Sequence, residues 1–144
     1  MIIDSLLTKR KKSKSLNELV GKRYSLLQKI RLKGIRSKKL TIQEVSPNLK
    51  SYFATHNAQY GHIELRPRGI VIRVNKGLQY FVWAIPFYQL YIYNLPTLNI
   101  HGQGKYVLFK NDKFLEKNSS FMQKLNQQKV QYDENHPHID AIDL

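Results

Sequence analysis

The chain has 144 residues, with 24 lysines and arginines against 10 aspartates and glutamates, so its formal net charge is +14. Its length suffices for one domain with a hydrophobic core and is too short for two ordinary ones. A composition of 42% hydrophobic and 24% charged residues excludes a disordered chain, and the lack of cysteine excludes disulfides, zinc–thiolate sites and thiol nucleophiles.

Positive charge is concentrated in the first third of the chain. Residues 1–50 carry 14 basic and 3 acidic side chains, residues 51–128 carry 9 and 3, and residues 129–144 carry 1 and 4. This gradient predicts that the first third faces solvent or an anionic partner, although a basic surface that serves only solubility has the same composition. Met1 to Leu7 is apolar and precedes the first basic run, which reverses the order of a secretory signal and predicts a cytoplasmic protein.

The N-terminal third is predicted to contain a flexible basic arm followed by a basic amphipathic helix. The arm includes Lys9 to Lys12 and Lys14. Ser15-Leu16-Asn17-Glu18 matches a capping box, in which serine and glutamate satisfy the amides of a helix start. Apolar residues then recur at helical spacing as far as Gly34, which is the predicted stop, and Gly21 weakens the continuity of this helix.

A further helix is predicted to begin at Ser46-Pro47, with serine as the cap and proline at the first helical position. It would carry Leu49, Tyr52 and Phe53 inward and end near His56-Asn57. This segment separates the basic third from the strands that follow.

Alternating apolar and polar residues and short turns predict an antiparallel meander of six strands between His62 and Lys110. The predicted turns are Pro67-Arg68-Gly69, Asn75-Lys76-Gly77 and Gly102-Gln103-Gly104. The predicted strands are residues 62–66, 70–75, 78–84, 85–94, 98–101 and 106–110.

The interval from Gly77 to Gly104 has 28 residues and no charged side chain, which is long enough for a membrane-spanning helix. Pro86 and Pro96 interrupt it, and residues that favour strands dominate it. We therefore expect central strands, apolar on both faces, with Pro86 at a strand start or a bulge, and no transmembrane segment.

After Asn111-Asp112 the apolar spacing becomes helical and predicts a helix from about Ser119 to Lys129. Ser119 or Ser120 would cap this helix, and its apolar stripe would close one side of the sheet. Residues 133–144 are acidic and are predicted to form a tail.

Residues 62–130 resemble a bacterial pleckstrin-homology-like or GRAM-type domain in strand order, in the segment Ile85-Pro86-Phe87-Tyr88-Gln89-Leu90 and in the final helix. The resemblance implies an α+β fold, with a six- or seven-stranded meander or partly open barrel capped by a C-terminal helix. Leu40–Val45 is the candidate for the seventh strand. The expected organisation is a basic arm and helix at 1–39, a PH-like domain at 40–132 and an acidic tail at 133–144.

The motifs of catalysis are missing from the sequence. There is no His-Glu-x-x-His metal motif and no Gly-x-Ser-x-Gly nucleophile elbow, and Gly102-Gln103-Gly104-Lys105-Tyr106 lacks the spacing and the hydroxyl of a phosphate loop. His62 and Glu64 share one face of a predicted strand, an arrangement that is common on solvated strands. We expect no enzyme activity, no cofactor and no metal site.

Polyanion binding is the function that the charge pattern favours, and sequence-independent binding of nucleic acid, RNA rather than DNA, is the first hypothesis. A peripheral membrane or protein-scaffold role is the alternative, with Leu16, Leu19, Leu27 and Ile30 in an anionic interface, and an open sheet edge would allow a protein partner or a homodimer. The proposed polyanion-binding residues are Lys9, Arg10, Lys11, Lys12, Lys14, Lys22, Arg23, Lys29, Arg31, Lys33, Arg36, Lys38 and Lys39. A secondary anion site would use Arg66, Arg68, Arg73 and Lys76.

Overall fold

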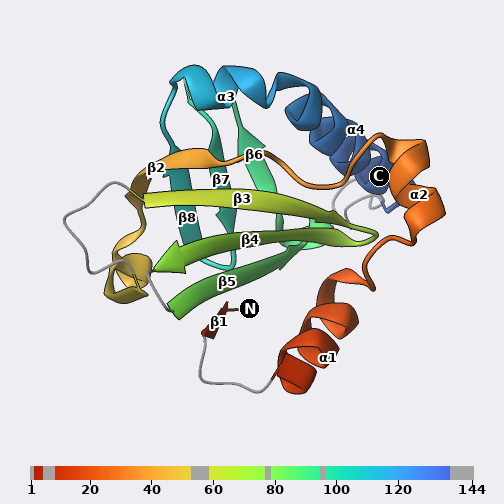
Figure 1. Ribbon diagram of the computed structural model, residues 1–144, viewed down its shortest axis with the longest axis horizontal. Helices are drawn as coiled ribbons and strands as arrows, with labels where there is room; N and C mark the ends of the chain where they lie inside the picture. The colour runs from red at the N-terminus through yellow and green to blue at the C-terminus, as the bar shows by residue number, and fades with distance from the viewer. Residues whose placement is uncertain (1, 5–8, 53–58, 77–78, 95–96, 137–144) are drawn as a thin grey trace, which may run out of the picture.

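The computed structural model describes residues 2–4, 9–52, 59–76, 79–94 and 97–136. The fold is α+β, as predicted, and its strands form one antiparallel sheet in the order β1-β5-β4-β3-β2-β8-β7-β6 (Figure 1). The strands are β1 (Ile2–Asp4), β2 (Leu40–Val45), β3 (Gln59–Arg66), β4 (Gly69–Lys76), β5 (Gln79–Pro86), β6 (Tyr91–Tyr93), β7 (Asn99–Gly102) and β8 (Lys105–Phe109).

Two meanders make up this sheet, one from β2 to β5 and one from β6 to β8. β2 joins them because it pairs with β3 on one side and with β8 on the other. The predicted strand at Leu40–Val45 is confirmed, so β2 to β8 give the seven strands of the expected meander. β1 is an additional edge strand on β5 that the sequence analysis did not predict.

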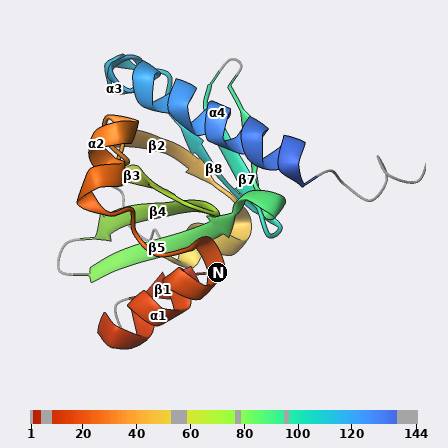
Figure 2. The same ribbon diagram turned by 90° about the vertical axis from the view of Figure 1, so that its right-hand side faces the viewer.

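The helical segments are α1 (Lys9–Val20), α2 (Leu26–Leu32), η1 (Pro47–Tyr52), η2 (Phe87–Gln89), α3 (Lys113–Lys117) and α4 (Ser119–Asn135), where η denotes a 3₁₀-helix. Figure 2 shows α4 along one side of the sheet and α1 along the opposite side. The helix predicted at Pro47 begins there but is a 3₁₀-helix, and Phe53, His56 and Asn57 lie outside the described residues.

The prediction of one amphipathic helix from Ser15 to Gly34 is wrong, because two helices with a break between them occupy this segment. α1 ends before Gly21, whose φ is 92°. Glycine adopts this left-handed conformation readily, whereas other residues rarely do. The capping box lies at Ser25 and Gln28 rather than at Ser15, which is inside α1. The predicted stop at Gly34 is close to the observed end, since Lys33 and Gly34 both have positive φ.

The predicted flexible arm is also wrong, because residues 9–14 are the first part of α1. Lys and Arg are good helix formers, and the C-terminal half of α1 is anchored on the sheet. There Leu16 and Val20 pack against Val71, Val82 and Ala84 of β4 and β5. Tertiary packing of these apolar residues therefore stabilises α1, of which residues 9–14 were predicted as an arm and residues 15–20 as helix.

The main core lies between the two meanders and beneath α4, which contributes Phe121, Met122 and Leu125. The predicted start of this helix at Ser119 is confirmed, but the helix continues to Asn135. Asp133 and Glu134 are consequently helical, although the acidic tail was predicted to begin at Asp133.

Of the two central strands predicted at residues 78–84 and 85–94, only the first corresponds to an inner strand of the sheet, which is β5. Pro86 ends β5, and η2 then leads to β6, which is an edge strand. The prediction that residues 85–94 are apolar on both faces is wrong, because Tyr88, Tyr91 and Tyr93 are exposed. Trp83 and Phe87 are buried and agree with the prediction.

Candidate functional site

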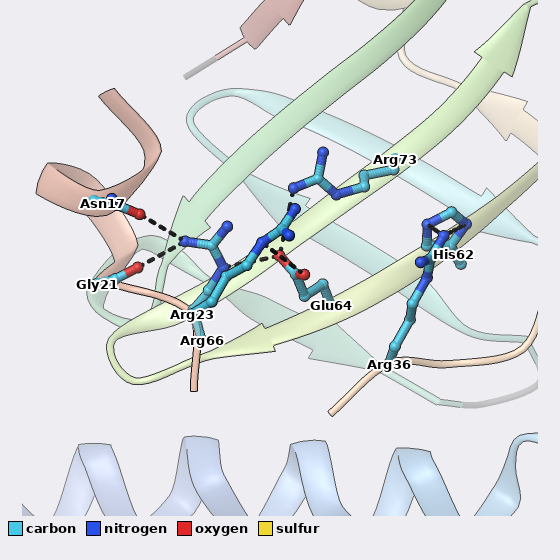
Figure 3. Close-up of polar contacts among 8 residues, drawn as sticks. All are labelled: Asn17, Gly21, Arg23, Arg36, His62, Glu64, Arg66 and Arg73. Carbon is cyan, nitrogen blue, oxygen red and sulfur yellow. Dashed lines mark hydrogen bonds and ion pairs between the residues drawn. The ribbon is translucent and has the colours of Figure 1, made fainter. Parts of the chain in front are cut away.

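Three arginines contact one buried glutamate on the outer face of β3 and β4, beside the segment that links α1 to α2, and a fourth arginine contacts His62 on the same strand (Figure 3). Glu64 and Arg66 lie two residues apart on β3 and therefore share a face. Arg73 comes from β4, Arg23 from the link between the helices and Arg36 from the segment after α2. We call Arg23, Arg36, Arg66, Arg73 and Glu64 the arginine cluster.

Arg66 uses its guanidinium to connect β3 with the end of α1. Its Nε donates to Glu64 Oε2 at 2.8 Å, and its Nη1 donates to the Gly21 carbonyl at 2.8 Å and to Asn17 Oδ1 at 3.2 Å. Only 2% of the side chain is exposed. Arg66 was predicted to bind an external anion, but the structure buries it with its donors engaged inside the protein.

Arg23 and Arg73 are held less tightly than Arg66, and Arg36 contacts His62 rather than Glu64. Arg23 Nε and Arg73 Nη2 each lie 3.5 Å from a carboxylate oxygen of Glu64, beyond the roughly 2.7–2.9 Å of a strong charged hydrogen bond. Arg36 donates through Nη2 to the ring of His62. Because Glu64 is already bound closely by Arg66, these guanidiniums keep donor capacity.

Burial and neighbouring charges shift several pKa values in the arginine cluster. The pKa of His62 is lowered to about 4, chiefly by burial and in addition by the cations Arg36 and Arg73, against the opposing effect of Glu64. Burial also lowers the pKa of Arg73, and the negative charge of Glu64 partly offsets this decrease. Burial by itself would raise the pKa of Glu64, but the hydrogen bond from Arg66 and the surrounding arginines leave it below its ordinary value. Positive charge therefore dominates this site.

A second feature is the apolar face of α2, which points to solvent. Leu26, Leu27 and Ile30 are 75%, 71% and 68% exposed. Successive residues of an α-helix are rotated by about 100°, so these three fall within one arc of about 100°. Arg31 lies just beyond one border of the arc and Lys29 just beyond the other, and both are exposed. We call Leu26, Leu27 and Ile30 the α2 apolar face.

The opposite side and the C-terminal end of α2 contact the rest of the protein. Leu32 lies on the opposite side of the helix and packs against the core together with Tyr24, whose pKa is raised by burial. At the C-terminal end, Lys124 Nζ of α4 donates to the carbonyl oxygens of Lys33 at 3.1 Å and Gly34 at 2.7 Å. Figure 1 shows α2 at the edge of the molecule beside α4. The α2 apolar face is thus held outward.

Most of the predicted polyanion-binding side chains are exposed. These are Lys14, Lys22, Arg23, Lys29, Arg31, Lys33, Arg36, Lys38 and Lys39. The side chains of Lys9, Arg10, Lys11, Lys12 and Lys76 lie outside the described part of the structure.

The structure brings two of these residues, from α1 and the segment after it, next to Arg68 in the turn between β3 and β4. Lys14, Lys22 and Arg68 line an open cleft of about 660 Å³ together with Asn17 and Glu18. Arg68 Nη2 donates to the carbonyl oxygen of Glu18 at 3.1 Å, which keeps its side chain against α1. Lys38 and Lys39 lie elsewhere, near the start of β2.

The expected membrane-facing stripe of Leu16, Leu19, Leu27 and Ile30 is divided by the fold. Leu16 is buried on the sheet, and Leu19 packs against the same cluster. Only Leu27 and Ile30 are exposed, and Leu26 joins them. The sequence carried a signal for this division, because Gly21 followed by the Ser25 to Gln28 capping box marks a helix end and a new helix start.

The described residues contain no group of three or more histidines and carboxylates arranged to hold a metal ion. No helix within the described ranges is both long and apolar enough to cross a membrane.

The protein is an α+β protein in which the N-terminal third packs against an antiparallel sheet and carries many exposed basic side chains. No protein-family model, curated protein or solved structure matches this chain. The resemblance to pleckstrin-homology-like or GRAM-type domains therefore stays a prediction.

Proposed function

We propose that this protein is a non-enzymatic protein that docks on anionic membrane surfaces through α2. The observation that carries the proposal is the α2 apolar face with cations on both of its borders. A helix with this distribution lies in the interface of a bilayer, with its apolar side chains among the acyl chains and its cations at the headgroups.

The energies of the two contributions favour docking. Full burial of a leucine or isoleucine side chain contributes about 1.5–3 kcal/mol, and each cation near an anionic leaflet adds about 1 kcal/mol. The docking helix is already folded, since Leu32 and Lys124 hold it on the domain, so binding does not require ordering the helix. Exposed aliphatic side chains add nothing to phosphate contacts with nucleic acid, which is why we rank the membrane first.

Vesicle binding of the full chain tests this proposal. We expect cosedimentation with vesicles of phosphatidylcholine and phosphatidylserine, little with phosphatidylcholine alone, and weaker binding as salt is raised. The double variant Leu27→Asp, Ile30→Asp should lose at least tenfold in vesicle affinity and keep its stability, because both side chains are exposed in the folded protein.

Val130→Asp is the matched control, because Val130 is also an exposed apolar residue on a helix but lies on α4. It should bind vesicles like the unchanged protein. Equal vesicle binding by the unchanged protein and the double variant would contradict docking through α2.

Nucleic-acid binding is the second candidate, favoured by the basic cleft at Lys14, Lys22 and Arg68. The single-residue variant Lys22→Glu should reduce the affinity for single-stranded RNA in a mobility shift and reduce the salt dependence of that affinity. The double variant on α2 distinguishes the two functions, because removal of its apolar side chains should weaken vesicle binding far more than RNA binding. If the double variant lost similar affinity for vesicles and for RNA, the result would contradict a specific role of the α2 apolar face in membrane docking.

A further inference from the structure

We propose that the arginine cluster binds a dianionic phosphomonoester group, held by Arg23, Arg36 and Arg73. This group occurs on soluble metabolites and on lipid headgroups, and its binding at this site does not depend on docking through α2. The proposal concerns the outer face of β3 and β4, whereas the proposed membrane contact uses the α2 apolar face.

The arginine cluster carries an excess of positive charge, which is the first argument. Three guanidiniums contact the Glu64 carboxylate and a fourth, that of Arg36, contacts the ring of His62, so four positive charges stand against one negative charge. His62 adds no further charge at neutral pH because its pKa is about 4. A monoanion would offset one of these charges, whereas a phosphomonoester offsets up to two and offers three acceptor oxygens.

The register of the strands is the second argument. Arg36 pairs with Glu64 across an isolated bridge on one side of β3, and Arg73 pairs with His62 on the other side. Cross-strand neighbours of this kind lie about 5 Å apart. The two arginines therefore flank the row formed by His62 and Glu64, and Arg23 reaches the same row from the link between α1 and α2 (Figure 3).

Donor capacity is the third argument. A guanidinium has five N–H donors. Among the described residues, Arg23 and Arg73 contact Glu64 only at 3.5 Å, and Arg36 contacts only the His62 ring through its side chain. The Arg73 side chain is 21% exposed and is held by its surroundings. The Arg23 side chain is 60% exposed and is accessible to a ligand from solvent. Arg66 is buried in the same cluster, where its Nε donates to Glu64 and its Nη1 donates to Asn17 and Gly21.

Titration with inorganic phosphate, followed by NMR of the histidine rings, tests the proposal on the full chain. At a pH of about 7.5, where phosphate is mainly a dianion, binding next to His62 should shift the ring signals of His62 with a saturable dependence on the phosphate concentration. Arg36→Gln and Arg73→Gln should each weaken phosphate binding at least tenfold. Lys110→Gln, which removes an exposed cation outside the arginine cluster, should leave the affinity within about twofold.

The proposal is overturned if phosphate up to about 10 mM gives no saturable shift of the His62 signals. It is also overturned if Lys110→Gln weakens binding as much as Arg73→Gln, because the effect would then be general attraction of anions. Should Arg73→Gln prove unfolded, Arg36→Gln still tests the site, since Arg36 is exposed.

Vesicles distinguish the two sources of the group. Stronger binding to vesicles containing phosphatidic acid than to vesicles of matched charge containing phosphatidylserine, with competition by glycerol 3-phosphate, would support a lipid-borne ligand. Equal binding to both vesicles, together with a His62 shift in phosphate, would support a soluble one. The Leu27→Asp, Ile30→Asp variant should keep the phosphate response of His62, so failure of membrane docking and failure of the anion site can be told apart.

Discussion

Glu64 and Arg66 are neighbours on the same face of β3, and both side chains are buried. Their ion pair is supported by the carbonyl oxygen of Gly21, which is the residue after α1. A buried charge is costly unless it is paired and hydrogen-bonded, so each member of this pair depends on the other. The pair also fixes where the chain leaves α1 and turns toward α2.

Glu64→Gln should therefore lower the free energy of unfolding by about 2–4 kcal/mol, because the buried Arg66 guanidinium would lose its counterion while an amide oxygen remains as an acceptor. Chemical denaturation measures the change. Glu44→Gln on β2 is the control, since Glu44 is exposed, and it should stay within about 0.5 kcal/mol. A comparable effect of the two substitutions would show that the buried pair contributes little.

His62 should make the stability depend on pH in mildly acidic solution. Its pKa is about 4 in the folded protein and 6.5 in the reference state, so between these values the unfolded chain binds more protons than the folded one. Stability should fall as the pH decreases from about 6.5 toward about 4, and Glu64, whose pKa is also lowered, extends the loss below 4.5. Denaturation of His62→Gln along the same pH series should show a flatter dependence above pH 4.5; an unchanged slope would contradict the assignment to His62.

At the scale of elements, α1 and the strand pair β4–β5 meet at a close backbone approach. Leu16 and Val20 lie on Val71, Val82 and Ala84, and the Arg68 N–H donates to the Val20 carbonyl at 2.9 Å. Gly69 begins β4 at this point, where a Cβ atom would lie 2.3 Å from the Ile85 carbonyl oxygen and 2.7 Å from Val20 Cγ1. Glycine is required here by space rather than by backbone conformation.

Gly69→Ala should lower the free energy of unfolding by about 3 kcal/mol or more, because the backbone of β5 cannot yield as a side-chain end would. Gly104→Asn is the comparison, since a Cβ atom at Gly104 meets nothing within 4 Å and asparagine tolerates its positive φ. That variant should lose less than about 1 kcal/mol. Thermal denaturation of both variants measures the difference, and equal losses would mean that contact with β5 is not the cause.

At the scale of the molecule, the N-terminal third belongs to the folded structure. β1 completes one edge of the sheet beside β5, and α1 covers an outer face that is otherwise apolar at Val71, Val82 and Ala84. The basic residues of this third are thus presented on a packed framework.

Deletion of residues 1–21 should accordingly destabilise the whole domain. It removes the burial of Leu16 and Val20, each contributing about 1.5–3 kcal/mol, and it leaves Arg66 without two of its acceptors. We expect a loss of at least about 4 kcal/mol by chemical denaturation. An unchanged unfolding midpoint would show that α1 does not stabilise the domain. Because we expect the deletion to destabilise the fold, substitution of single basic residues is the better test of their role in binding.

The sequence by itself determined the antiparallel meander and the start of α4. Period-two alternation marked β3 and β4, glycine-containing turns marked the hairpins, and Phe121, Met122 and Leu125 marked the helix, because each of these signals is local. The strand at Leu40–Val45 was proposed only because the resemblance implies a seventh strand. The sequence also located the basic residues, since charge does not depend on the fold.

Only the tertiary structure decided which apolar and basic residues face solvent. Leu16 and Leu27 occur in similar basic surroundings in the sequence, yet one packs on β4 and β5 and the other is exposed on α2. Arg66 and Arg73 are likewise alike in sequence, but contacts with Asn17 and Gly21, more than forty residues away, bury Arg66 and leave Arg73 beside Glu64. Burial depends on contacts between segments distant in sequence, and no local pattern encodes those contacts.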